Sequence, residues 1–258
     1  MEWGIAAALL LALPASLYFL QDRMIFHPQP MAPARHALTA QQAQSIFIHA
    51  GDGTRLHAWH RAGSPLVLYF GGNAEKVSWM LGAGARQAPG SGWLLVDYRG
   101  YGSSGGTPSE KALVRDAIEF FDHAREKLGA KKVVLFGRSL GSGVAVQVAA
   151  ARPAAALILV APYDSMTSIG QHHYPFLPVR WMLKHRFDSL GAAAAVRAPA
   201  LFLVAERDEV IPPVYSKRLF EAWQGPKRWV GVEGAGHNST DDARVFWPAI
   251  REFLVQLN

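Results

Sequence analysis

The chain has 258 residues, which suits one large α/β domain and is short for two. Half of the residues are hydrophobic, so a sizeable core can form, and the absence of cysteine excludes disulfides, thiolate metal sites and a cysteine nucleophile. The net charge of +6 is spread without a basic run, which argues against nucleic-acid binding and fits an anionic membrane surface better.

The N-terminal segment from Trp3 to Leu20 contains 18 residues and no charge. As a helix it would reach about 27 Å, which is just enough to cross the hydrocarbon core of a bilayer. We therefore predict a single-pass membrane anchor over residues 1–22, with the side of the membrane left open. A cleaved signal peptide and a buried N-terminal helix are the alternatives, and Glu2 argues against the signal peptide.

Residues 23–43 are rich in proline and are predicted to link the anchor to a domain over 44–258. That domain begins with two alternating segments, 45–50 and 55–61, on either side of a Gly-Asp-Gly turn, a pattern typical of an antiparallel hairpin. Short apolar runs and helical patterns then alternate. The runs are 65–70, 92–98, 132–137, 155–162, 199–206 and 227–234.

Continuous aliphatic runs of this length are typical of strands buried on both faces. The stretch 109–129 between two of them carries apolar residues at helical spacing, with Ser109 as a candidate N-cap and Gly129 as a candidate stop. We therefore predict an eight-stranded, mostly parallel, doubly wound sheet with helices on both faces.

The stretch "LFGRSLGSG" (135–143) places Ser139 between Gly137 and Gly141, where an apolar run gives way to a helical pattern. The spacing matches the G-x-S-x-G nucleophile elbow, in which small neighbours let the backbone turn sharply and expose the hydroxyl. An ordinary helix cap is the alternative reading of Ser139. Ser142 also lies in this stretch and is interpreted as a packing residue.

A serine nucleophile needs a base, and the base needs a carboxylate that orients it. Asp208 follows the run 199–206, and His237 lies in a glycine-rich loop after the run 227–234. The carboxyl ends of parallel strands share one edge of a sheet, so we predict a Ser139–His237–Asp208 triad there.

Other carboxylates could take the place of Asp208. Glu206 and Glu209 flank it in the same loop, and Asp164 follows an earlier strand in "APYDSM". Asp208 fits best because it lies at the apex of its loop, and Asp164 is the second choice.

An acyl-transfer site also needs backbone N–H groups that bind the developing oxyanion. Leu140 supplies one, directly after the nucleophile. The loop "GGNAE" (71–75) is expected to supply the other from Asn73, with Gly72 as the alternative donor. A plain turn without this role is the competing interpretation of the loop.

Five motifs in order, "LYFGGNAE", "DYRGYGSSGGTPSE", "GRSLGSG", "RDEVIP" and "GAGHN", resemble the α/β-hydrolase superfamily. The chain is most similar to the small membrane-anchored, bud-emergence-type hydrolases. The resemblance implies an α/β-hydrolase fold and supports the triad, but it does not specify a substrate. Gly71 stands where that family often has histidine. Asp97, Tyr98 and Arg99 are interpreted as scaffold.

Residues 163–198 form an expected cap insertion, which is rich in aromatic residues, proline and methionine. Tyr163, Phe176 and Trp181 are predicted to line the substrate pocket, which favours an apolar acyl or lipid-like substrate. The alternative is that these aromatics only pack the cap against the domain.

Together these features predict a membrane-anchored serine hydrolase that cleaves carboxylic esters or thioesters of acyl or lipid-like substrates. No cofactor, metal or nucleic acid is implied, and the oligomeric state stays open. A peptidase with the same triad and a catalytically silent, membrane-tethered binding protein are the alternatives.

Overall fold

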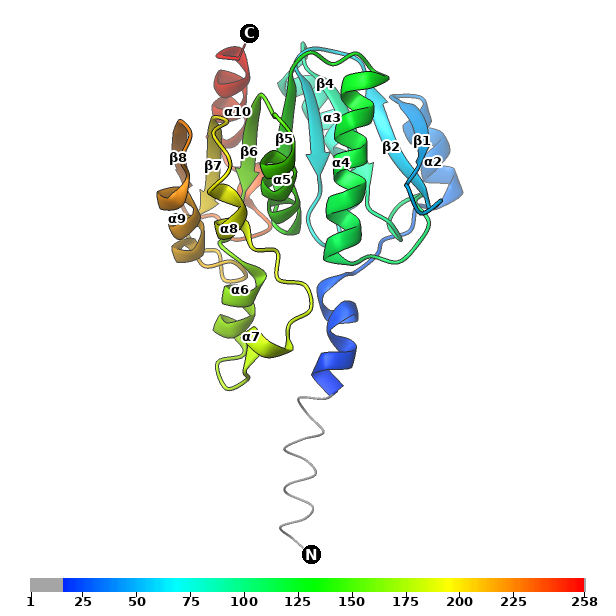
Figure 1. The fold of residues 1–258 in the computed structure, drawn as a ribbon. Coiled ribbons are helices and arrows are strands. Elements are labelled where there is room, and N and C mark those ends of the chain that lie inside the picture. The colour runs from blue at the N-terminus through cyan, green and yellow to red at the C-terminus, as the bar shows by residue number, and fades with distance from the viewer. Residues whose placement is uncertain (1–15, 258) are drawn as a thin grey trace, which may run out of the picture.

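The computed structural model describes residues 16–257, which form an eight-stranded sheet with helices on both faces (Figure 1). The strands are β1 (Gln44–His49), β2 (Arg55–Arg61), β3 (Leu66–Phe70), β4 (Gly92–Asp97), β5 (Val133–Arg138), β6 (Ala156–Val160), β7 (Ala200–Ala205) and β8 (Lys227–Val232). Their order in the sheet is β1-β2-β4-β3-β5-β6-β7-β8, and only β2 runs antiparallel to its neighbours. The prediction of an eight-stranded, mostly parallel sheet is confirmed.

The helices connect these strands. They are α2 (Pro33–Ala40), α3 (Trp79–Gln87), α4 (Glu110–Glu126), α5 (Leu140–Ala151), α6 (Met166–His173), α7 (Val179–Met182), α8 (Ser189–Ala193), α9 (Pro213–Ala222) and α10 (Phe246–Val255). Helices α4, α5, α8 and α9 share one core cluster, and α3 and α10 share another on the opposite face. The predicted cap insertion contains α6, α7 and α8 between β6 and β7.

The buried strands alternate between these two cores. In β5, Val133 and Leu135 belong to the core beneath α4 and α5, whereas Val134 and Phe136 belong to the core beneath α3 and α10. Successive side chains of a strand point to opposite faces, so a strand covered on both sides must be apolar at every position. This requirement explains the continuous hydrophobic runs of the sequence.

Helix α4 shows how local sequence sets the boundaries of an element. The Ser109 hydroxyl accepts a hydrogen bond of 3.3 Å from the backbone N–H of Ala112 and so caps the first turn. After the last turn, Gly129 adopts a φ of 67°, a conformation that glycine tolerates best. The helix therefore begins and ends where the sequence predicts.

The expected linker over 23–43 is ordered against the domain. Residues 16–25 are helical, and the side chain of Phe26 is buried in the core. The backbone N–H of Met31 donates to the carbonyl of Gly102 over 3.0 Å, and α2 follows. Residues 23–43 therefore pack against the domain as part of it.

Most of the apolar segment that was predicted as an anchor lies outside the described residues. Between residues 16 and 257, no helix combines the length and the apolar character that crossing a bilayer requires.

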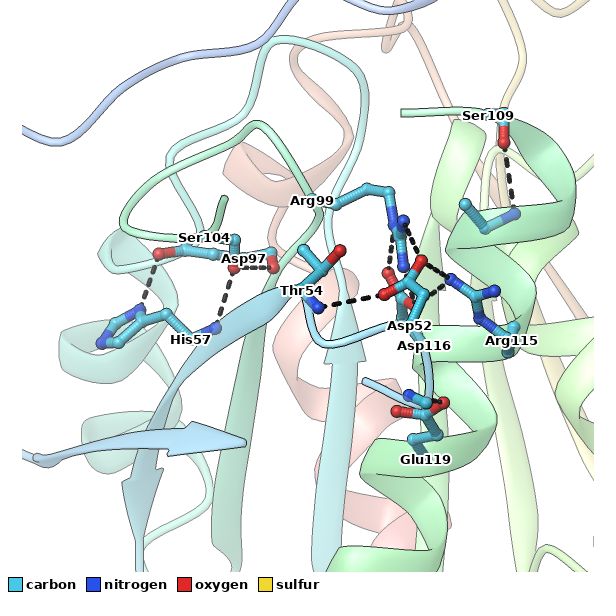
Figure 2. A network of polar contacts seen from close by, with 12 residues as sticks. Asp52, Thr54, His57, Asp97, Arg99, Ser104, Ser109, Arg115, Asp116 and Glu119 are labelled. Carbon is cyan, nitrogen blue, oxygen red and sulfur yellow. Dashed lines mark hydrogen bonds and ion pairs between the residues drawn. The ribbon is translucent and has the colours of Figure 1, made fainter. Parts of the chain in front are cut away.

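A buried ion-pair network fixes the loop after β4 (Figure 2). The Arg99 guanidinium makes two hydrogen bonds to Asp116 of α4, of 2.6 and 2.5 Å, and a third of 3.0 Å to Asp52 in the hairpin turn. Arg115 also reaches Asp52. Thr54 and the two arginines together hold the pKa of Asp52 well below its ordinary value. Through Arg99 the loop thus connects α4 to the hairpin, which is a structural role as interpreted from the sequence.

Replacing Asp116 with alanine is expected to lower the free energy of unfolding by about 3 kcal/mol or more, because it leaves the buried Arg99 charge without its main partner. Chemical denaturation of the variant and the wild type measures this difference. The surface pair Arg228–Glu252 provides the control, and Glu252→Ala is expected to change stability by about 1 kcal/mol or less. Equal effects of the two substitutions would contradict the role assigned to Arg99 and Asp116.

Candidate active site

Ser139 lies at the sharp turn between β5 and α5. Its φ of 51° and ψ of −118° are a strained conformation for a residue with a side chain. A Cβ at position 137 would overlap the carbonyl of Gly141, and a Cβ at position 141 would overlap the carbonyl of Phe70. Glycine at both positions therefore lets the strand and helix approach closely enough to present the Ser139 hydroxyl above the sheet.

Three side chains meet at this turn from three different strand ends. His237, in the loop after β8, lies with Nε2 at 3.0 Å from Ser139 Oγ and Nδ1 at 2.7 Å from Asp208 Oδ2. Asp208 follows β7, and its other oxygen accepts hydrogen bonds from the backbone N–H groups of Val210 and Ile211. The structure thus brings together the three residues predicted as a triad, with the carboxylate held in place.

The rival carboxylates lie elsewhere. Asp164 is buried, but it accepts a hydrogen bond from the backbone N–H of Ser165 and pairs with Arg218. Glu206 and Glu209 are both exposed to solvent. Ser142 is buried inside α5, and its hydroxyl donates to the carbonyl of Ser139.

The loop 71–75 lies against Ser139, since a Cβ at Gly72 would be 3.6 Å from the Ser139 Cβ. The Gly72 N–H already donates to Glu75 Oε2 over 2.6 Å, so the alternative oxyanion donor is occupied. Within the part of the chain that the structure describes, the N–H groups of Leu140 and Asn73 have no hydrogen-bond partner. This pair is therefore free to bind a ligand.

Two side chains hold the loop in this conformation. Asn73 Oδ1 accepts hydrogen bonds from the N–H of His27, from the Tyr101 hydroxyl and from the N–H of Ala74. The carboxylate of Glu75 accepts three more, which sequence reasoning did not anticipate because nothing in the spacing of "GGNAE" identifies their donors.

The donors to Glu75 are the Tyr69 hydroxyl, the Trp79 indole N–H and the Gly72 N–H, each at 2.6 Å. Burial, reinforced by the nearby Glu75 carboxylate, raises the pKa of Tyr69 well above its ordinary value, so its hydroxyl remains a donor. Glu75 thus fixes the backbone of Gly72 and, through it, the neighbouring N–H of Asn73.

If Asn73 is an oxyanion donor, as predicted, replacing Glu75 with glutamine is expected to lower kcat for hydrolysis by about 10- to 100-fold with little change in KM, since loss of one such donor costs about 100- to 1000-fold. The amide retains only one acceptor oxygen for three donors. Steady-state kinetics on a soluble ester measures the effect. Glu209→Gln, at an exposed carboxylate, is the control. A KM increase without loss of kcat would contradict a role in positioning the loop.

Ser139 and His237 open onto a cavity of about 710 Å³. Its walls are mostly apolar and come from the cap and from the helix of residues 16–25, hereafter the N-terminal helix. Ile169, Leu177, Val179, Met182 and Leu183 form the cap side. A site of this size and composition is suited to a largely apolar ligand.

The N-terminal helix was predicted as part of an anchor, yet it forms one wall of the cavity. The lining residues are Leu17, Tyr18, Gln21, Met24 and Ile25, which lie on one face of a helix. Gln21 holds this helix against the cap, donating to the carbonyl of Met182 over 3.1 Å and accepting from the N–H of Lys184 over 2.7 Å. The helical spacing of these lining residues could have identified this wall of the cavity from the sequence.

Of the three predicted pocket residues, only Tyr163 lines the cavity, and it is fully buried. The prediction for Phe176 and Trp181 is wrong, because their side chains are 98% and 80% exposed and neither lines the cavity. In helix α7, Val179 faces the cavity. Trp181 comes two positions later and therefore points to the opposite side of the helix. Phe176 lies in the loop before α7.

A second Ser–His–Asp arrangement exists in the sheet, away from the cavity. His57 is fully buried, with Nδ1 at 2.7 Å from Asp97 Oδ2 and Nε2 at 2.9 Å from Ser45 Oγ. The N–H of His57 also donates to the Ser104 hydroxyl. None of these residues lines the cavity, so this network fastens β1 and β2 to the loop after β4. Figure 2 shows His57 beside Asp97 and Ser104.

Comparison with known proteins agrees with this architecture. The family described as Hydrolase_4, serine aminopeptidase S33, matches residues 65–192. The uncharacterized protein Rv2307c of Mycobacterium tuberculosis is 38% identical over 92% of this chain and 88% of its own. The α/β hydrolase domain-containing protein 17B of Xenopus tropicalis is 30% identical over 91% and 83%. The chain therefore belongs to the α/β-hydrolase superfamily.

Other similarities are more distant. A yeast protein named uncharacterized membrane protein YNL320W is 27% identical over 94% of this chain and 91% of its own. Among solved structures, the Pyrococcus furiosus esterase Pf2001 aligns with a TM-score of 0.70 at 15% identity, over 91% of this chain and all of that one. Est1E from Butyrivibrio proteoclasticus aligns with a TM-score of 0.67 at 16% identity, over 83% and 98%. At these identities the structural likeness establishes the fold alone.

Proposed function

We propose that this α/β hydrolase cleaves carboxylic esters or thioesters of acyl or lipid-like substrates, with Ser139, His237 and Asp208 as its catalytic triad. The observation that carries the proposal is the hydrogen-bonded chain from Ser139 Oγ through His237 to Asp208, at the wall of an apolar cavity. The esterases among structures of the same fold are consistent with this class of reaction.

In the proposed mechanism Ser139 Oγ attacks the acyl carbon, and His237 Nε2 takes the serine proton and passes it to the leaving oxygen or sulfur. Asp208 keeps the proton of His237 on Nδ1 and stabilises the imidazolium that forms. The N–H groups of Leu140 and Asn73 bind the tetrahedral oxyanion. Water, deprotonated by His237, then attacks the acyl-enzyme and releases the acid while the proton returns to Ser139.

The cavity favours an ester over a peptide substrate. An aminopeptidase must bind a cationic α-amino group, which calls for a free carboxylate near the nucleophile. Of the cavity-lining residues between 16 and 257, Glu75 alone carries a carboxylate, and it already accepts three hydrogen bonds. Most of the other lining residues are apolar and suit an acyl chain.

Turnover of p-nitrophenyl esters of increasing chain length tests this proposal. We expect kcat/KM to rise from acetate towards medium chains, since each methylene that becomes buried contributes about 0.8 kcal/mol, or roughly fourfold. Aminoacyl p-nitroanilides are expected to remain uncleaved. Cleavage of the anilides in preference to the esters would support the peptidase, and no turnover of either class by the folded protein would support the silent binding protein.

We also propose that residues 1–22 anchor the protein in a membrane. The uncharged stretch from Trp3 to Leu20 supports this, as does the printed name of the yeast relative.

A further inference from the structure

Phe176 and Trp181, the two most exposed aromatic side chains of the cap, belong to a larger apolar surface beside the cavity. We define the apolar rim as Phe19 and Leu20 of the N-terminal helix with Tyr174, Phe176 and Trp181 of the cap. Phe176 is 98%, Trp181 80% and Phe19 74% exposed. The N-terminal helix and α7 lie at the same end of the molecule, away from α10 (Figure 1). A cluster of large apolar side chains on a water-facing surface is typical of a binding surface.

Contacts between the N-terminal helix and the cap make the rim a continuous surface. His185 Nε2 lies 2.9 Å from Asp22 Oδ1, and the Lys184 ammonium lies 4.7 Å from the centre of the Tyr18 ring. The hydrogen bonds of Gln21 to the cap fix the same junction. The aromatic residues of both segments are therefore held in a fixed relation around the cavity.

Within the two segments that carry the rim, residues 16–25 and 166–187, the charges are almost all positive. Residues 166–187 contain Arg180, Lys184 and Arg186, all exposed, and no carboxylate. The N-terminal helix adds Arg23 and the single carboxylate Asp22, which is paired with His185 and Lys184. Exposed aromatic residues flanked by arginine and lysine are typical of surfaces that contact anionic bilayers.

The sequence that precedes the rim points to the same partner. The chain reaches Phe19 through a segment without charge that begins at Trp3. Phe19, Leu20 and Arg23 do not line the cavity and lie on a different face of the N-terminal helix from the residues that do. One helix thus joins the apolar N-terminal segment, the rim and the cavity wall.

We infer that the apolar rim docks on the surface of a bilayer that contains anionic lipids, so that the cavity faces the membrane and not bulk water. The docking itself does not depend on the catalytic chemistry. That a lipid ester enters the cavity directly from the bilayer rests on the proposed function.

The chain contains no cysteine, so single cysteines can be placed without background labelling. Phe176→Cys reports on the rim, and Val255→Cys in α10, which is 69% exposed, reports on the opposite end. The full chain with each substitution is labelled with a polarity-sensitive fluorophore and reconstituted in phosphatidylcholine–phosphatidylglycerol vesicles. Quenching by iodide in water is then compared with quenching by brominated lipid.

We expect brominated lipid to quench the label at position 176 at least about threefold more than the label at 255, and iodide to show the reverse order. Quenching at 176 should increase with the fraction of phosphatidylglycerol. Equal iodide quenching at the two positions would overturn the inference, and so would protection of position 176 from both quenchers, which would indicate a second copy of the chain.

The measurement requires no turnover and can be repeated in Ser139→Ala. Failure of the proposed ester hydrolysis would therefore leave the quenching unchanged, and failure of the docking would leave the hydrolysis of soluble esters unchanged. Phe176 does not line the cavity, so its replacement keeps the activity towards a soluble ester.

Discussion

Replacing Ser139 with alanine is expected to lower kcat towards a soluble ester by about 10⁴-fold or more, because no acyl-enzyme can form without the hydroxyl. Ser139 Oγ lies 3.0 Å from His237 Nε2, where the base can take its proton. The residual rate is expected to come from substrate binding and from the proposed oxyanion donors Leu140 and Asn73. Steady-state kinetics on the wild type and the variant measures the loss.

Ser142→Ala is the matched control, since it removes a hydroxyl from the same helix. That hydroxyl is buried and donates to the carbonyl of Ser139, so its loss is expected to cost less than about tenfold in kcat. Thermal denaturation establishes that both variants fold. If Ser142→Ala were inactive and Ser139→Ala fully active, the assignment of the nucleophile would be wrong.

Asp208→Asn is expected to lower kcat by about 10³- to 10⁴-fold, because the amide favours the wrong tautomer of His237 and cannot stabilise the imidazolium. The carboxylate lies 2.7 Å from His237 Nδ1, and its geometry is held by two backbone N–H groups that the amide can also engage. The variant should therefore fold normally and lose activity through kcat.

Asp164→Asn is the comparison for this experiment. Asp164 is equally buried, but its partners are Ser165 and Arg218. We expect it to retain kcat within about tenfold while losing some stability, because the Arg218 contact is weakened. An inactive Asp164→Asn beside a fully active Asp208→Asn would show that the orienting acid has been assigned to the wrong residue.

Local sequence was sufficient to predict the centre of the sheet because strands β3 to β7 are covered on both sides, whereas the edge strands β1 and β8 are partly exposed. Continuous runs such as those of β5 and β7 leave few alternatives to buried parallel strands, and each run matches an observed strand. The placement of Ser139, Asp208 and His237 followed from the same pattern. Each comes after a different strand, so the parallel topology brings all three to one edge.

Interactions between segments distant in the sequence could not be predicted in this way. The hydrogen bonds of Glu75 depend on the relative positions of β3 and α3. The buried His57 depends on the register that places it opposite Phe47 and Asp97. Composition alone indicated an aromatic cap but not which side chains turn inward, and the exposure of Phe176 and Trp181 depends on how α7 packs.

The N-terminal helix combines an apolar sequence with a position at the wall of the cavity. Its uncharged beginning suggested a membrane segment, and its contacts show a wall of the cavity as well. A hydrolase whose cavity is lined by the last residues of its proposed anchor, among them Leu17, Tyr18 and Gln21, would hold the site close to the bilayer. This arrangement connects the proposed substrate class with the proposed docking surface.

Mapping the adduct of a fluorophosphonate probe tests whether Ser139 is the nucleophile, because such probes react with serines that a neighbouring base activates. We expect one labelled peptide, containing Ser139, in the wild type and in Ser142→Ala. We expect no labelled peptide in Ser139→Ala. A folded wild type that takes up no probe, or a Ser139→Ala variant labelled as strongly as the wild type, would show that Ser139 is not an activated nucleophile.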